Sequence, residues 1–207
     1  MSEALLAEYV RGGIVESKHF GHLIALDASG APVLIKGDPN VLIYPRSAIK
    51  SIQASAMVRK GLDQEVRHLA LICASHSGSR THTEVALQIL KTAGLDESAL
   101  QCVKDRPIGV QERKDWGDQE PTRLAMNCSG KHAGMLATCV VNNWPIESYL
   151  DPAHPLQVAI REELETLAGE KVAKISVDGC GAPLFLLSMR GLANAFYKLA
   201  TSTDPIH

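Results

Sequence analysis

The spacing of apolar residues predicts strands near the start of the chain and helices over most of the rest. Residues 22–27 and 32–36 are two short runs rich in β-branched residues and leucine, separated by an Ala-Ser-Gly turn sequence. A hairpin is the expected structure. From Ser47, apolar residues recur at three- and four-residue steps as far as Gly61. This spacing is typical of a helix with a glycine at its C-terminal end.

Further along the chain, short helices alternate with loops and a few strands. Residues 69–74 are continuously apolar, and periodicity does not separate a strand from a buried helix there. Polar residues with proline and glycine predict a loop over 101–121. We expect one strand at 172–177 and helices at 83–91, 130–141, 155–167 and 192–200. Strands first, then helices mixed with a few strands, indicate an α+β fold.

Length and charge narrow the classes of protein that the chain can belong to. Its 207 residues suit one domain or slightly more, and a net charge of -2 leaves no positive excess for a nucleic-acid backbone. No apolar run reaches the length of a membrane helix, and the first residues lack the pattern of a signal peptide. We therefore expect a cytoplasmic protein without nucleic-acid or membrane partners. Five cysteines, an odd number, favour free thiols or metal ligands over disulfides.

The first candidate for chemistry is the pair Ser47 and Lys50 at the predicted helix start. Residues three apart share a helix face, so a neutral Lys50 amine could remove the Ser47 proton during attack on a carbonyl. About one Ser-x-x-Lys match is expected by chance in a chain of this composition. A helix-capping Ser47 with a solvated Lys50 is therefore an open alternative.

The second candidate is the segment 73–78, with the sequence Cys-Ala-Ser-His-Ser-Gly, directly after the apolar run. Small hydroxyl residues and a glycine there allow the backbone to approach a ligand closely. The alternative is a serine-rich turn. We expect His76 to be an orienting group behind the site or a core histidine, and not a general base.

Two further segments carry cysteines: 127–132 (Asn-Cys-Ser-Gly-Lys-His) and 178–181 (Asp-Gly-Cys-Gly). Cys128 and Lys131 stand three apart at a predicted helix start, where the helix dipole favours a thiolate. Cys180 follows a strand on a glycine turn. Two thiolates and a neutral amine would suit zinc with a fourth position open to water. Each cysteine alone is as well explained as a small buried apolar residue.

In this order and spacing, the four motifs closely resemble those of the rhizobial-type (class 3) L-asparaginases, the asparaginase II family. Segments 11–16 and 197–200 also resemble the family, so the similarity covers 1–207 as one asparaginase II-like domain. The family is similar in fold to serine β-lactamases and glutaminases, which implies a sheet of that kind with flanking helices. Family members continue well beyond segment 197–200, so we expect a chain incomplete at its C-terminus.

The resemblance implies hydrolysis of the asparagine side-chain amide to aspartate and ammonia, through an acyl-enzyme. Ser47 would be the nucleophile, Lys50 its base and Ser75 the second hydroxyl of a paired Ser/Lys system. Asparagine is the implied small-molecule partner, and a homodimer is compatible with the resemblance. A zinc site is also implied, with three ligands and two supporting residues: Cys128, Lys131 and Cys180, then Asp178 and His76.

Two departures from the family pattern leave other functions open. Ser79 stands where the family commonly has glutamate, and a distant second lysine that would pair with Ser75 has no counterpart. The alternatives are a catalytically inactive zinc-binding fragment of an asparaginase and a β-lactamase-like serine acylase that needs Ser47 and Lys50 alone. The preference between asparagine and glutamine is open. Proximity makes Arg46 and Arg80 the candidates for binding a substrate carboxylate.

Overall fold

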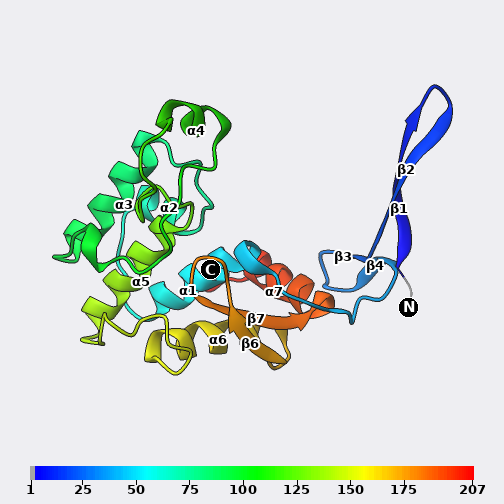
Figure 1. The fold of residues 1–207 in the computed structure, drawn as a ribbon. Coiled ribbons are helices and arrows are strands. Elements are labelled where there is room, and N and C mark those ends of the chain that lie inside the picture. Colours follow the sequence, from blue (N-terminus) through cyan, green and yellow to red (C-terminus); the bar gives the residue numbers. More distant parts are fainter. Residues whose placement is uncertain (1–2) are drawn as a thin grey trace.

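The computed structural model describes residues 3–207 and combines antiparallel strands with helices (Figure 1). This mixture agrees with the expected α+β class. The strands are β1 (Ala4–Arg11), β2 (Ile14–Gly21), β3 (Leu23–Leu26), β4 (Pro32–Lys36), β5 (Leu42–Ile43), β6 (Lys174–Val177) and β7 (Pro183–Ser188). The helices are α1 (Lys50–Arg59), α2 (Val66–Ile72), α3 (Arg80–Thr92), α4 (Val110–Trp116), α5 (Ser129–Val141), α6 (Pro155–Ala168) and α7 (Met189–Thr201), with short 3-10 turns η1 (Arg46–Ile49) and η2 (Glu97–Ala99).

The strands form two hairpins and one three-stranded antiparallel sheet in the order β5-β7-β6. The predicted hairpin is confirmed as β3 and β4, in which Ile24 pairs with Ile35. The hairpin of β1 and β2 and the central strand β7 were not predicted. β7 is buried along nearly its whole length and so lacks polar–apolar alternation. The turn between β1 and β2 was a usable signal, because Gly12 and Gly13 both have positive φ, at 57° and 81°.

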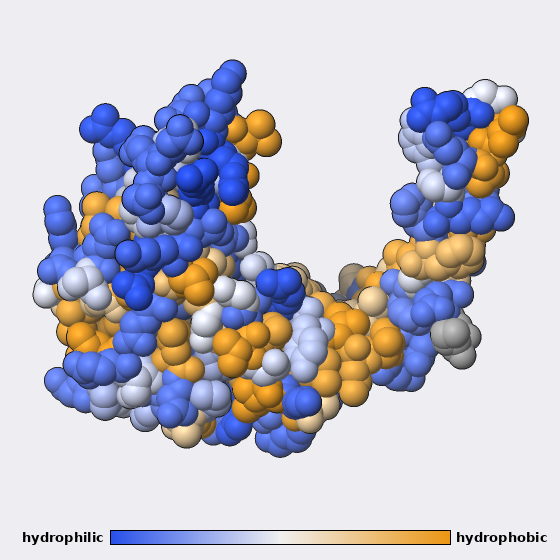
Figure 2. All heavy atoms as spheres, viewed as in Figure 1, coloured by the Kyte–Doolittle hydropathy of each residue, from blue (hydrophilic) through white to orange (hydrophobic). Residues whose placement is uncertain are grey.

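The β1–β2 hairpin projects away from the helical body as an arm (Figure 1). Its strands pair with each other, and apolar side chains such as Tyr9, Ile14 and Phe20 are exposed along it. Figure 2 shows hydrophobic residues on the surface of the arm and near its base. Exposure on both faces of the hairpin explains why its pattern of apolar and polar residues did not reveal two strands.

The core lies around α5, whose first eleven residues are buried between α1, α2, α3 and α6. Two glycines allow α2 to approach this helix closely. A Cβ on Gly130 would lie 2.7 Å from the Leu71 side chain, and one on Gly134 would lie 2.8 Å from Ile72. The close approach places the end of α2, and therefore the 73–78 segment, beside the first turn of α5.

The structure decides the open alternative at 69–74 and corrects the loop expected over 101–121. The run at 69–74 belongs mostly to a helix, α2, which settles the open alternative. The loop expected over 101–121 was wrong in part, because it contains α4. Tertiary contacts anchor that short helix, since Ser77 donates to Glu112 at 2.7 Å and the Gly109 amide donates to the Ser77 carbonyl at 2.9 Å. Within residues 3–207, no helix combines the length and apolarity needed to cross a membrane.

Candidate active site

Lys50 is a buried cationic side chain at the first position of α1, only 1% exposed. Its Nζ donates to the Ala74 carbonyl at 2.6 Å and to the Ser75 Oγ at 2.9 Å. Burial lowers the pKa of Lys50 from its ordinary value, because desolvation disfavours the charged amine. Ser75 itself is exposed just beyond α2. A buried amine therefore contacts a hydroxyl that substrate can reach.

Ser47 is exposed within η1, the 3-10 turn that leads into α1. The expected contact between the Ser47 hydroxyl and Lys50 does not form among the described residues. The Lys50 side chain reaches the segment that follows α2 instead, since the Ala74 carbonyl and the Ser75 hydroxyl satisfy its buried amine. The role of Ser47 as nucleophile stays a prediction.

Arg46 directly precedes Ser47 and has an unusual backbone conformation for a residue with a side chain, with φ at 49°. Left-handed backbone costs such a residue about 1 kcal/mol. The Arg46 Nε and Nη2 both lie 3.0 Å from the Oδ1 of Asp178. This ion pair joins the turn that carries Ser47 to the turn that carries Cys180.

Cys128, Lys131 and Cys180 form a buried cluster, and each is 2–3% exposed. Lys131 Nζ donates to Cys180 Sγ at 3.3 Å. A hydrogen-bonding interaction with the Cys128 thiol, followed by those with His132 and Lys131, lowers the pKa of Cys180 well below its usual value. The same thiol interaction, together with burial, raises the pKa of Cys128. The two sulfurs and the Lys131 amine therefore lie close enough to influence one another's protonation.

The four sequence motifs converge in space. Besides the contacts of Lys50 with Ser75 and of Lys131 with Cys180, the His76 amide donates to the Asn127 carbonyl at 3.1 Å. This bond links the 73–78 segment to the first turn of α5. Segments separated by more than a hundred residues thus contribute to one site, as the motifs predicted.

His132 belongs to the same cluster, although the sequence reasoning gave it no role. It is fully buried, and its Nδ1 lies 2.7 Å from the hydroxyl of Tyr149. Its Nε2 is buried without a hydrogen-bond partner in the part of the chain that the structure describes. Burial lowers the pKa of His132 to about 4, and a hydrogen-bonding interaction with Cys180 opposes this shift. Its place as the last residue of the 127–132 motif was a signal that could have identified it.

His76 is buried, and its ring does not contact Ser75. Its Nε2 is 2.8 Å from the Ser129 hydroxyl at the start of α5. Burial, followed by the nearby charges of His82 and Lys50, lowers the pKa of His76 to about 4. The ring is therefore neutral at physiological pH and orients the two segments that it joins.

The buried His76 predicts a loss of stability in acid. Between pH 6.5 and about 4 the unfolded chain takes up a proton that the folded ring refuses, so the free energy of unfolding falls as pH falls through this window. The expected loss from this residue is roughly 3 kcal/mol. Urea unfolding at pH 7 and pH 4.5 should show a smaller pH effect in His76→Gln than in wild type. The control is His19→Gln, on the exposed strand β2; an equal reduction in both variants contradicts the assignment.

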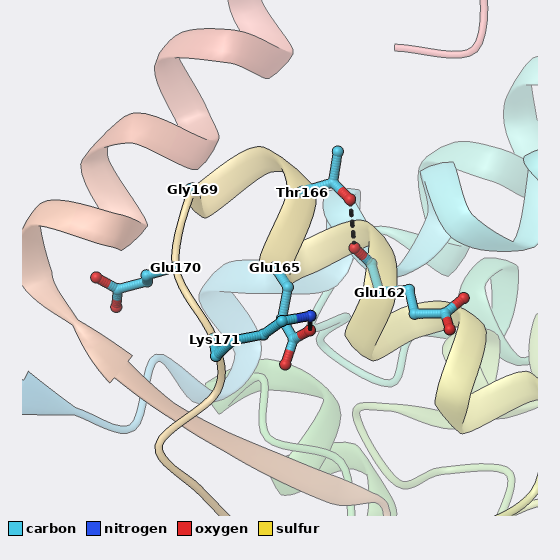
Figure 3. Close-up of a pocket in the computed structure, with 6 residues that line it drawn as sticks. All are labelled: Glu162, Glu165, Thr166, Gly169, Glu170 and Lys171. Atoms are coloured by element: carbon cyan, nitrogen blue, oxygen red, sulfur yellow. Dashed lines mark hydrogen bonds and ion pairs between the residues drawn. The ribbon is translucent and has the colours of Figure 1, made fainter.

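A surface pocket at the C-terminal end of α6 is unrelated to this cluster (Figure 3). Its side chains already serve structural contacts. Lys171 pairs with Glu165 at 2.6 Å, and the carboxylate of Glu170 accepts from the amide and hydroxyl of Ser188. The pocket shares no residue with the four motifs.

Comparison with known proteins supplies one match. A family model described as L-asparaginase II matches residues 7–207. No curated protein matches the chain. The family match covers the β1–β2 arm from Ala7 onward as well as the whole of the buried site.

Proposed function

The chain belongs to the L-asparaginase II family of amidohydrolases, and we propose that it hydrolyses asparagine through an acyl-enzyme formed on a serine that Lys50 activates. The observation that carries this proposal is the 2.9 Å hydrogen bond between the buried Lys50 amine and the exposed Ser75 hydroxyl. A lysine held in this way can exchange protons with a serine that attacks a carbonyl. The hydrogen bond to Ser75 therefore favours a role for Lys50 in a serine mechanism over a purely structural role.

In the first half-reaction, the serine oxygen attacks the side-chain amide carbon of asparagine as its proton passes to the neutral Lys50 amine. The resulting ammonium group then protonates the departing nitrogen, so that ammonia leaves and an aspartyl ester remains on the serine. In the second half-reaction, water attacks the ester and Lys50 again accepts and returns the proton. Aspartate is released, and the enzyme regains its starting protonation state.

Two serines are candidates for the nucleophile. Ser47 is the one that the family resemblance implies, and it lies three residues before Lys50 in an exposed turn. Ser75 is favoured by its direct hydrogen bond to the Lys50 amine. We propose Ser47 as nucleophile, with Ser75 as the second hydroxyl that passes its proton to Lys50, and Ser75 itself as the second candidate.

The buried cysteine cluster has a donor set that fits zinc. His, Cys, Asp and Glu side chains alone form no group of three or more that could hold a metal among residues 3–207. Cys128 and Cys180, however, contribute two sulfurs, and Lys131 adds a nitrogen 3.3 Å from one of them. We propose that these three residues hold zinc, which when bound would polarise or position polar groups of the substrate.

Three other features are proposals that rest on family resemblance. They are a β-lactamase-like arrangement of the fold, residence in the cytoplasm and assembly into a homodimer.

Acid quenching during turnover of asparagine, followed by peptide mass mapping, identifies the acylated serine. We expect an aspartyl adduct on the peptide containing Ser47, absent in Ser47→Ala, whose turnover should fall by about 10³-fold. Ser51→Ala, on the same helix as Lys50, is the control and should retain both adduct and turnover. An adduct on Ser75 would transfer the role of nucleophile to that residue. Full turnover by both Ser47→Ala and Ser75→Ala would contradict the covalent route.

A further inference from the structure

We propose that Arg46 and Asp178 together bind the zwitterionic end of the substrate, the α-carboxylate and α-ammonium groups of an amino-acid amide. The inference rests on the proposed function. It adds the two residues by which the site would select an amide that carries both an α-carboxylate and an α-ammonium group. A free amino acid carries one negative and one positive group on a single carbon. A guanidinium and a carboxylate held side by side are complementary to both groups.

The geometry of the pair leaves one atom of each partner available. Arg46 directs Nε and Nη2 to the same carboxylate oxygen, Oδ1 of Asp178, at 3.0 Å. The Gly179 amide donates to that oxygen as well, at 2.8 Å. Arg46 Nη1 and Asp178 Oδ2 take no part in these bonds. A substrate carboxylate can therefore accept from Nη1 while its ammonium group donates to Oδ2.

The surroundings hold the pair in place while keeping it open to solvent. The Arg46 side chain is 64% exposed and the Asp178 side chain 11%. A Cβ on Gly179 would lie 3.3 Å from Arg46 Nη2, so the absence of a side chain at Gly179 allows the guanidinium to lie over the backbone there. A guanidinium fixed on one side and open on the other is suited to binding a ligand.

The pair gains little stability for the protein, which favours a functional role. An ion pair whose arginine is largely exposed contributes little to folding, whereas Arg46 has a left-handed backbone that disfavours residues with side chains. This conformation sits at the residue directly before Ser47, the proposed nucleophile. Strain at such positions commonly accompanies a constraint on binding or catalysis.

Arg80, the other arginine close to the motifs in sequence, does not meet these conditions. Its Nε donates to Glu84 at 2.7 Å, one turn along the same helix, and its side chain is 92% exposed. The Arg80–Glu84 ion pair makes no hydrogen bond to segments 127–132 or 178–181, which carry Cys128, Lys131 and Cys180. Arg80 is therefore a suitable control.

The test compares three amides in the full chain: asparagine, succinamate (which lacks the ammonium group) and 3-aminopropanamide (which lacks the carboxylate). We expect Arg46→Gln to raise the KM for asparagine by about tenfold or more, with a much smaller effect on kcat, and to remove the preference for asparagine over 3-aminopropanamide. Asp178→Asn should instead remove the preference over succinamate. Arg46→Lys should restore part of the carboxylate preference, and Arg80→Gln should behave as wild type.

Unchanged KM values and preferences in folded Arg46→Gln and Asp178→Asn would overturn the proposal. Circular dichroism and metal content establish that each variant is folded and retains the neighbouring cysteine cluster. Titration calorimetry with aspartate, the product, separates this inference from the proposed reaction. If wild type releases no ammonia from asparagine but binds aspartate and Arg46→Gln does not, the reaction fails and the binding site stands. If wild type binds aspartate no better than Arg46→Gln does, the binding site is wrong.

Discussion

Replacing Lys50 with methionine is expected to reduce ammonia release from asparagine by about 10³-fold, the contribution typical of a positioned acid–base group. Methionine has a similar length and suits a position only 1% exposed, so the fold should tolerate it. It cannot accept the serine proton or return it to the leaving nitrogen. Steady-state ammonia release, measured at saturating asparagine, gives kcat directly.

The matched control for this substitution is Lys60→Met, at the exposed C-terminal end of α1. It makes the same substitution at the residue that ends the same helix and should leave kcat within about twofold of wild type. Near-UV circular dichroism shows whether each variant keeps its packing. A folded Lys50→Met variant that retains more than about a tenth of wild-type kcat would show that Lys50 is not the base.

The second large effect is expected at the cysteine cluster. Replacing Cys128 with serine removes one of two sulfur ligands from a site whose third donor is a lysine, and the zinc content should fall from about one ion per chain to background. The loss follows because a hydroxyl is a poor substitute for a thiolate with a soft metal. Metal analysis of dialysed protein, purified in the presence of zinc, measures the stoichiometry.

Cys139→Ser is the control for the zinc measurement. Cys139 is also buried on α5, with 0% exposure, but it lies outside the cluster. It should retain wild-type zinc. Equal zinc in Cys128→Ser and wild type would mean that the ligands are wrong, even if the family assignment and the serine chemistry stand.

Sequence periodicity predicted the elements in which one face is buried and failed where that asymmetry is missing. The helices at 83–91 and 155–167 have buried and exposed sides and were located within a few residues. The β1–β2 arm is exposed on both faces and β7 is buried on both, so neither shows alternation. The short helix α4 depends on the contact of Glu112 with Ser77, which local sequence does not reveal.

The motifs predicted which segments meet at the site, but not how their side chains pair. Spacing along one helix suggested Ser47 as the partner of Lys50, whereas the folded chain brings Ser75 to it from α2. The approach depends on Gly130 and Gly134, whose role is visible only once α2 and α5 are packed. The Arg46–Asp178 pair joins residues 132 positions apart, a distance over which sequence spacing carries no information.

The most direct test of the central claim is release of aspartate and ammonia from asparagine by the wild-type chain, followed together over time. The site predicts equal amounts of both products, an initial burst of ammonia if hydrolysis of the aspartyl ester is slow, and turnover that Lys50→Met loses and Lys60→Met retains. The account would be contradicted if folded wild-type protein released neither product. It would also be contradicted if the Lys50→Met variant released both products at the wild-type rate.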